Sequence, residues 1–247
     1  QLGGAAAAKG AGVVFLLDEV QFVDEIEYRS VITALHRATQ KNMPITLAAA
    51  GLPQIPRLTG EARSYAERLF SFPVIANLSE TDATAALVEP ARQQDVAYEP
   101  QAVDLALSWT GGYPFYIQQL GKHAWNLAGS SPITATDVEA AMPAAQTALD
   151  ASIYEVRIQR ATDQERRYMR AMAELGSGPY KSGDVAAKLG RKTPEVSMIR
   201  QRLLDKGLVY ATEDYGYVDF TVPRFGGFMA RRMPYRAPRA RSDPDGS

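Results

Sequence analysis

The sequence predicts a mixed fold: a partial parallel α/β sheet, then an all-α domain, then a C-terminal domain of three helices and a hairpin. Two apolar runs, 13–17 and 45–51, flank one amphipathic helix and predict the sheet. Short helices with clear start signals fill residues 79–160, and the helix and hairpin signals follow from residue 162. We therefore predict domains over 1–78, 79–160 and 161–233, with a disordered tail over 234–247.

The composition is that of an ordinary soluble protein with more than one domain. The chain has 247 residues, of which 46% are hydrophobic and 22% are charged. No apolar run approaches the roughly 18 residues of a membrane span and no signal-like segment is present, so we expect a cytoplasmic protein without membrane contact. Zero cysteines exclude disulfides and thiolate metal sites, and the two histidines, His36 and His123, do not favour a histidine metal cluster. The first residue is Gln rather than Met, so we expect the natural polypeptide to be longer.

Charge is distributed unevenly along the chain. Residues 1–161 hold 11 Lys/Arg and 17 Asp/Glu, a balance of -6, whereas residues 162–232 hold 13 and 9, a balance of +4. The tail adds 3 and 2, so the total is -1. A basic C-terminal part joined to an acidic body points to an anionic partner for the former, and nucleic acid is the first candidate.

The run Val13–Leu17 predicts a strand buried on both faces, as in parallel sheets covered by helices. Asp18 and Glu19 follow it directly. Open α/β sheets bind ligands beyond the carboxyl ends of their strands, where carboxylates can hold Mg²⁺ or polarise an attacking water. The alternative is a core strand that simply surfaces into a polar loop.

The flanking segments complete one strand–helix–strand unit. Residues 1–12 are mostly Gly and Ala and are predicted to be a loop or flexible end; their glycine and lysine spacing does not match a phosphate-binding loop. An amphipathic helix should begin near Asp24 and end near Lys41, and a second buried strand should run from Ile45 to Gly51. The unit predicts one right-handed parallel crossover. Two strands do not make an independent sheet, so further strands must come from elsewhere.

The middle of the chain predicts short helices. A short helix within 61–72 and an extended segment over 72–78 come first. Ser79 caps a helix expected to end before Pro90, and Thr134 caps another that Pro143 should break or kink. Between them, prolines at helix starts and a Gly-Gly stop predict two more. The expected spans are 79–89, 100–110, 114–128, 134–143 and a helical connector over 144–160.

The C-terminal part predicts a winged helix. Thr162 with Glu165 forms a capping box for a helix to about Leu175, and two further helices over 184–189 and 195–206 have the helix–turn–helix form. Strands over 208–212 and 217–222 then alternate around a turn. The second helix of the pair would present cations to DNA phosphates or base edges; they are Arg191, Lys192, Arg200, Arg202 and Lys206. The alternatives are a solvated helix face and a protein contact.

Taken together, the segments resemble an AAA+ ATPase over about residues 10–232. Val13–Glu19 resembles the Walker B strand, Ile45–Pro53 resembles the sensor 1 strand, and the helices around Thr110–Phe115 resemble the lid. A winged helix directly after the lid is similar to the archaeal origin-initiator branch and to the signal-transduction ATPases with numerous domains (STAND). The most specific parts are the Asp-Glu strand end and the order of the segments.

The resemblance assigns roles to individual residues. It makes Asp18 the Mg²⁺ ligand, Glu19 the catalytic base, and Gly112 and Tyr113 nucleotide-contacting lid residues. It makes Arg68 an arginine that reaches the γ-phosphate of a neighbouring subunit in a homo-oligomer; the alternative is an ordinary surface arginine.

Three departures from the family pattern stand out. Residues 49–51 lack the usual sensor 1 polar side chain unless Thr46 or Gln54 substitutes. The lid helix lacks an arginine in its first turns, and the Walker A loop is absent.

These features predict a parent ATPase that uses ATP/ADP and Mg²⁺, with its phosphate-binding loop upstream of Gln1. The chain alone should hold no cofactor and should not hydrolyse ATP, because the loop supplies most of the grip on the phosphates. Two functions stay open. One is a DNA-engaging ATPase, and the other is a nucleotide-dependent signalling or scaffold switch whose winged helix binds protein.

Overall fold

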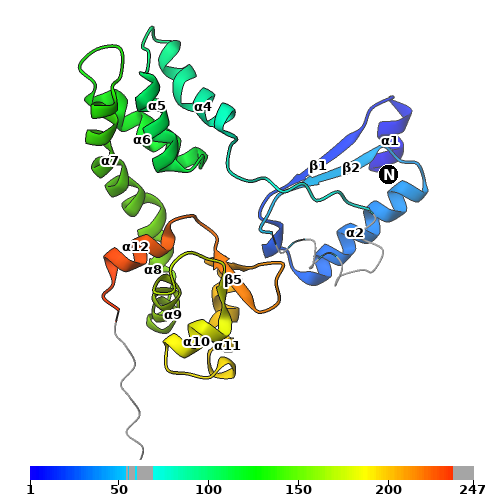
Figure 1. Cartoon of the computed structure of the whole chain (residues 1–247). Helices are drawn as coiled ribbons and strands as arrows, with labels where there is room; N and C mark the ends of the chain where they lie inside the picture. The colour runs from blue at the N-terminus through cyan, green and yellow to red at the C-terminus, as the bar shows by residue number, and fades with distance from the viewer. Residues whose placement is uncertain (54, 56–58, 60–68, 236–247) are drawn as a thin grey trace, which may run out of the picture. The chain divides into compact units, whose positions relative to one another are not determined.

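The computed structural model describes residues 1–53, 55, 59 and 69–235, and the chain divides into two compact units. Residues 75–160 form one unit, and residues 1–74 with 161–247 form the other. Figure 1 shows the order of elements along the chain. The predicted helix over 61–72 and the tail from residue 236 lie largely outside the described residues, as does Arg68.

The N-terminal segment contains the predicted parallel crossover. Strand β1 (Val13–Leu17) pairs with β2 (Ile45–Ala49) in parallel, with Val13 opposite Ile45 and Leu17 opposite Ala49. Between them lie a 3-10 turn, η1 (Val20–Phe22), and helix α2 (Glu25–Gln40) (Figure 1). The Asp24 carboxylate caps α2 by accepting a hydrogen bond from the Ile26 N–H at 2.8 Å, which confirms the predicted helix start.

Two expectations about this segment are wrong. Residues 2–8 form a helix, α1 (Leu2–Ala8), where a loop was expected, because the alanines favour helix and Gly3 lies buried close to Met43 and Ile45. Strand β1 is not buried on both faces: Val14 is 58% exposed and Leu16 is 77% exposed. In the described residues its sheet has two strands, which leave much of the apolar surface uncovered. Residues 71–78 carry no strand.

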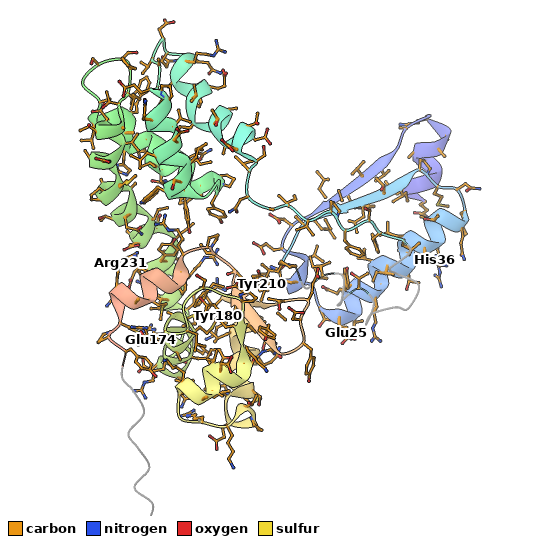
Figure 2. All side chains as sticks on the ribbon, viewed as in Figure 1. Glu25, His36, Glu174, Tyr180, Tyr210 and Arg231 are labelled. Atoms are coloured by element: carbon orange, nitrogen blue, oxygen red, sulfur yellow. The ribbon has the colours of Figure 1, made fainter. Side chains whose placement is uncertain are left out.

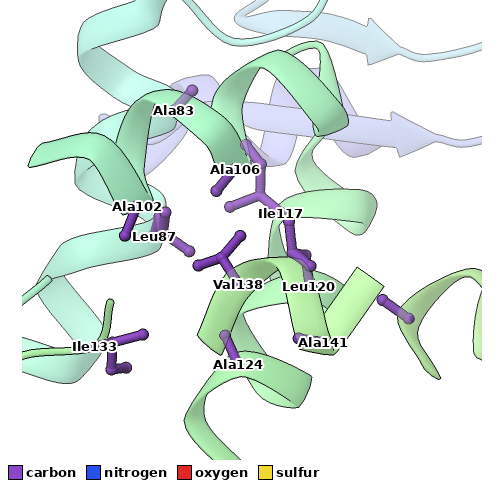
Figure 3. Packing of buried hydrophobic residues seen from close by; sticks show 11 residues of the cluster. Ala83, Leu87, Ala102, Ala106, Ile117, Leu120, Ala124, Ile133, Val138 and Ala141 are labelled. Atoms are coloured by element: carbon purple, nitrogen blue, oxygen red, sulfur yellow. The ribbon is translucent and has the colours of Figure 1, made fainter. Parts of the chain in front are cut away.

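The unit 75–160 is a set of packed helices. These are α4 (Glu80–Arg92), α5 (Pro100–Thr110), α6 (Pro114–Leu127) and α7 (Ala135–Leu149), followed by a π-helical turn (Asp150–Tyr154) and α8 (Glu155–Gln159). The predicted caps are confirmed: Ser79 accepts from the Asp82 N–H, and Thr134 forms a capping box with Asp137. Figure 3 shows the core, which contains Ala83, Leu87, Ala102, Ala106, Ile117, Leu120, Ala124, Ile133, Val138, Ala141 and Ala145.

Both prolines that were expected to limit helices lie inside them. Pro90 is in the last turn of α4, where it removes one backbone hydrogen bond and the helix ends two residues later. Pro143 lies in the middle of α7, between the fully buried Ala141 and Ala145. Core packing on both sides of Pro143 offsets the roughly 3 kcal/mol that an interior proline costs a helix.

The C-terminal part contains the predicted helices and hairpin. Helices α9 (Asp163–Ala173), α10 (Ser182–Lys188) and α11 (Thr193–Asp205) precede strands β4 (Val209–Ala211) and β5 (Tyr217–Phe220). The sequence did not predict β3 (Tyr180–Lys181) or helix α12 (Phe225–Arg232). The three strands form an antiparallel sheet in the order β3-β5-β4, and Tyr168, Met169, Met172, Leu203 and Phe225 are buried side chains of this part.

Burial changes the acidity of several side chains on this small sheet. Burial, with the nearby Asp219 carboxylate, raises the pKa of Tyr180 to about 12. Tyr210, labelled with Tyr180 in Figure 2, has its pKa raised by the same two causes. Burial also raises the pKa of Asp219, although a hydrogen bond from the Phe220 N–H opposes the shift. Among the described helices, none combines the length and the apolar character that a membrane crossing needs.

Candidate functional site

The acid pair lies where strand β1 ends. The Ala50 N–H donates to the Leu17 carbonyl at 2.8 Å, and the Val20 N–H donates back to the Ala50 carbonyl at 3.1 Å. Asp18 and Glu19 therefore emerge at the carboxyl end of the parallel pair, and both are exposed. The Asp18 Oδ1 atom accepts the Glu19 N–H at 2.8 Å, and Glu19 adopts the left-handed conformation with φ of 54°. This is the end of the strands beyond which open α/β sheets bind ligands.

Gln21 joins the acid pair to the turn after β2. Its Nε2 atom donates to Glu19 Oε2, and its Oε1 atom accepts the Leu52 N–H at 3.1 Å. A Cβ on residue 51 would lie 2.5 Å from the same Oε1 atom, so the glycine is needed for this approach. Gln21 was not among the predicted site residues. No spacing rule could identify it, because its partner Leu52 lies 31 residues away.

The acid pair suits a magnesium ion held together with phosphates. Mg²⁺ is usually bound through one or two carboxylates, with waters and substrate phosphates completing its shell. The exposed carboxylates of Asp18 and Glu19 at the strand end match the one or two carboxylates that a protein usually supplies to Mg²⁺. Within the part of the chain that the structure describes, no group of three or more His, Cys, Asp or Glu could hold a metal by itself.

The end of β2 offers no polar side chain for this site. Ala49, Ala50 and Gly51 are exposed, and Ala50 contributes only its backbone. Thr46 lies three residues before the strand end, opposite Val14, so it does not replace the missing group. Gln54 and Arg68 lie outside the described residues, and their expected roles remain predictions.

In the unit 75–160, Gly112 and Tyr113 form the junction between α5 and α6. Gly112 has φ of 73°, and its carbonyl accepts the Leu78 N–H at 3.0 Å. A Cβ at this position would lie 2.7 Å from the Leu78 carbonyl oxygen, so the approach requires glycine. Asn77 Nδ2 donates to the Gly111 carbonyl at 2.9 Å, and Tyr113 packs edge-on against Tyr116. The junction is thereby fixed against residues 77–78.

A pocket of about 340 Å³ opens beside this junction. Its lining residues are mostly apolar or glycine and include two acidic residues; they are Leu78, Glu80, Ala83, Asp104, Leu107, Gly111 and Gly112. Its volume is within the range of small-molecule sites. The carboxylates favour a ligand that presents hydrogen-bond donors or positive charge.

The predicted basic residues divide into two groups. Arg191, Lys192 and Arg202 are exposed at or on α11. Arg200 is half-buried near Tyr168. Burial raises the pKa of Tyr168, and the positive charge of Arg200 opposes part of this rise. The exposed surface of α11 also carries Glu195 and Asp205 among its residues.

Lys206 has an intramolecular partner. Its Nζ atom donates to Glu165 Oε2 at 2.7 Å, and Glu165 is only 1% exposed. Burial alone would raise the pKa of Glu165, but the hydrogen bonds from Lys206 and the Thr162 N–H lower it overall. This ion pair ties the end of α11 to the start of α9 and engages the Lys206 ammonium within the protein, which disfavours the predicted DNA contact of Lys206.

The turn between β4 and β5 is acidic. Glu213, Asp214 and Tyr215 are all exposed, and Tyr215 is completely so. Phosphate would be repelled by the two carboxylates here. The turn thus differs in charge from the exposed cations Arg191, Lys192 and Arg202.

Comparisons with known proteins match part of the chain to a family of undefined role and match most of the chain to solved structures of similar fold. Residues 151–229 match a domain of unknown function, DUF8462, and no curated protein sequence matches the chain. A structure of the RuvB Holliday junction branch migration motor of Thermotoga maritima has 18% identity and a TM-score of 0.49, with 96% of this chain and 76% of RuvB covered. A Walker-type ATPase of Pyrococcus abyssi (PABY2304) has 12% identity and a TM-score of 0.62, with 93% of this chain and 66% of that chain covered.

The likeness to the Pyrococcus protein is one of fold. It covers 93% of this chain, so it extends over residues of both units. At the level of the fold, this likeness agrees with the ATPase resemblance predicted from the acid pair and the order of segments. The chain has a fold like that of this Walker-type ATPase, mostly helical with a small parallel sheet.

Proposed function

We propose that this chain is the C-terminal part of an ATPase of the AAA+ class, in the archaeal origin-initiator or STAND-like branch. The observation that carries the proposal is the exposed Asp18–Glu19 pair at the carboxyl end of a parallel strand, in a chain with a Walker-type ATPase fold. Strand-end carboxylates of this kind serve phosphoryl transfer by positioning metal and water.

The two acids have different roles in this proposal. Asp18 would hold Mg²⁺, which would supply positive charge to the nucleotide phosphates. Glu19 orients the attacking water and accepts its proton. The phosphate-binding loop is supplied by residues outside this chain, so the chain alone binds nucleotide weakly and does not turn it over.

Lid residues complete the nucleotide contact in this proposal. The pocket beside Gly112 and Tyr113 has the size of a small-molecule site, and its two carboxylates can accept hydrogen bonds from amino groups. Arg68 is proposed to reach a neighbouring subunit's γ-phosphate in a homo-oligomer.

We further propose that residues 161–233 form a winged helix that contacts DNA. Support comes from the helix–strand–helix–helix–hairpin order and from the exposed Arg191, Lys192 and Arg202. Arg200 would contribute to the local positive potential from its half-buried position.

A second function is favoured by one observation. The turn 212–216 would be the wing, and it exposes Glu213, Asp214 and Tyr215. An acidic, aromatic tip disfavours phosphate and suits a protein surface. The alternative is a nucleotide-dependent signalling or scaffold switch that exposes this tip to a protein partner.

ATP turnover tests the ATPase proposal. In a form of the protein extended upstream to include its phosphate-binding loop, Glu19→Gln should retain nucleotide binding and lower turnover by about 10² to 10⁴-fold. Unchanged turnover in Glu19→Gln would remove the role given to this residue.

A salt titration separates the two functions of the C-terminal part. The affinity for a fluorescent DNA duplex should fall steeply between 50 and 200 mM salt. The reason is that each phosphate contact releases roughly one counterion from the DNA on binding. The double variant Arg191→Ala/Lys192→Ala should reduce the salt slope by about two, whereas Lys41→Ala/Lys122→Ala serves as the charge-matched control. Absence of DNA binding at low salt, with and without ATP, would favour the protein-binding switch.

A further inference from the structure

We propose that Gln21 is a positioning residue that fixes the Glu19 carboxylate to the backbone turn after β2. The inference rests on the proposed ATPase function, because a catalytic Glu19 gives the contact its purpose. It supplies a polar link at a strand end where residues 49–51 offer none.

Both ends of the Gln21 side-chain amide are used. Oε1 accepts the Leu52 N–H at 3.1 Å, and Nε2 donates to Glu19 Oε2. A backbone N–H can only donate, so its partner must be the amide oxygen. The amide nitrogen, which can only donate, is thereby directed at the Glu19 Oε2 atom. The chemistry of the two partners fixes the orientation of the amide.

The turn after β2 is shaped to receive this side chain. A Cβ on residue 51 would lie 2.5 Å from Gln21 Oε1 and 2.4 Å from Ile55 Cδ1. Both distances are shorter than van der Waals contact, so a side chain there would displace the amide. We call the link from the Glu19 carboxylate through the Gln21 amide to the Leu52 N–H the clamp. Next to it, the hydrogen bond from the Val20 N–H to the Ala50 carbonyl, at 3.1 Å, holds the two turns together.

The clamp also supports an unfavourable backbone conformation. Glu19 is in the left-handed region, with φ of 54° and ψ of 42°, which is unfavourable for a non-glycine residue. The Asp18 Oδ1 bond to its N–H and the Gln21 bond to its carboxylate hold it there. A shift of the turn at residues 51–52 would therefore move the Glu19 carboxylate.

Two substitutions separate positioning from simple support of the turn. In Gln21→Glu the new carboxylate can still accept the Leu52 N–H but cannot donate to Glu19. In Gln21→Met neither bond forms. Amide hydrogen exchange of Leu52 in the 247-residue chain should match the wild type in Gln21→Glu and be about fivefold faster in Gln21→Met. Unchanged Leu52 exchange in Gln21→Met would show that the clamp does not exist.

Turnover then tests the catalytic consequence in the upstream-extended form. Both variants should lower kcat by up to about 100-fold and leave KM for ATP within about threefold, because misplacing a reacting group mainly affects the chemical step. A purely structural role predicts loss in Gln21→Met alone. Wild-type kcat in Gln21→Glu would overturn the inference. If the extended wild type does not hydrolyse ATP, the proposed function fails, whereas the Leu52 exchange still decides whether the clamp forms.

Discussion

The helices of residues 75–160 and the strand pair of residues 13–49 differ in how far they bury their apolar side chains. The helical unit encloses its apolar side chains in one cluster, with Leu120 and Ile117 almost completely buried. Around α2, Ile32 is the fully buried residue of a small cluster with Tyr28, Leu69 and Phe70. Strand β1 meanwhile exposes Val14 and Leu16. The first region is a closed core, whereas the second exposes apolar side chains of β1.

This difference bears on the proposed site. The acid pair is carried by the open region, and its geometry comes from backbone bonds and Gln21 rather than from side-chain packing. Polar contacts at an exposed strand end hold residues less firmly than a packed core does. The contrast is consistent with a nucleotide site that gains its remaining parts from outside the chain.

The largest expected effect distinguishes the two regions directly. Leu120→Ala should lower the unfolding free energy of the helical unit by about 3 to 4 kcal/mol, because the fully buried side chain leaves a cavity. Leu16→Ala, the matched change at a 77% exposed position, should cost about 0.5 kcal/mol or less. Native-state hydrogen exchange of each unit's amides measures both. Equal costs would mean that β1 is covered as well as the helical core.

A second pair of variants asks whether the C-terminal part is as closed as the helical unit. Glu165→Ala removes a buried partner of Lys206 and one half of a capping box, and should cost about 2 to 3 kcal/mol. Glu195→Ala, at the same position of an exposed helix start, should cost about 0.5 to 1 kcal/mol. Urea unfolding followed by circular dichroism gives both values. A Glu165→Ala cost no larger than that of Glu195→Ala would contradict a buried ion pair.

The same ion pair predicts a pH dependence. The folded-state pKa of Glu165 is lowered, so its contribution is fully present above the unfolded pKa of about 4.3 and is lost as pH falls through the folded value. Glu165→Gln should therefore lose less stability than the wild type on acidification below about pH 4.3. Identical acid profiles of the wild type and Glu165→Gln would refute the assignment.

The smallest expected effect concerns Asp219 beside Tyr180. Burial raises the folded-state pKa of Asp219, so its ionised form weakens the fold at neutral pH. Asp219→Asn keeps an oxygen for the Phe220 N–H and should raise the Tm by a few degrees at pH 7. The gain should shrink as pH falls, because the wild-type carboxyl protonates first in the folded state. Thermal unfolding at pH 7 and pH 4, with the exposed Asp214→Asn as control, checks both signs.

Local features were predictable from the sequence, whereas burial and distant contacts were not. Thr134 and Thr162 cap helices through residues three positions away, so their pattern is visible in a short window. Burial of β1 depends on how many strands and helices surround it, and a run of apolar residues contains no such information. Helix α12 includes Gly226 and Gly227, which disfavour helix, but it packs against α9 and forms nonetheless.

The candidate site shows the same division. Asp18 and Glu19 were identified because they follow an apolar run directly. Gln21 acquires its role only when the chain returns at Leu52, and Lys206 is engaged by Glu165 across 41 positions. Neither relation follows from spacing along the sequence.

The central claim is that Asp18 and Glu19 form the metal and water side of an ATP site whose phosphate-binding loop lies outside this chain. The direct measurement is Mg²⁺-dependent ATP hydrolysis by the 247-residue chain, by the upstream-extended form, and by that form carrying Glu19→Gln. We expect turnover in the extended wild type alone. Turnover in the 247-residue chain, or an extended form in which Glu19→Gln is as active as the wild type, would contradict the claim.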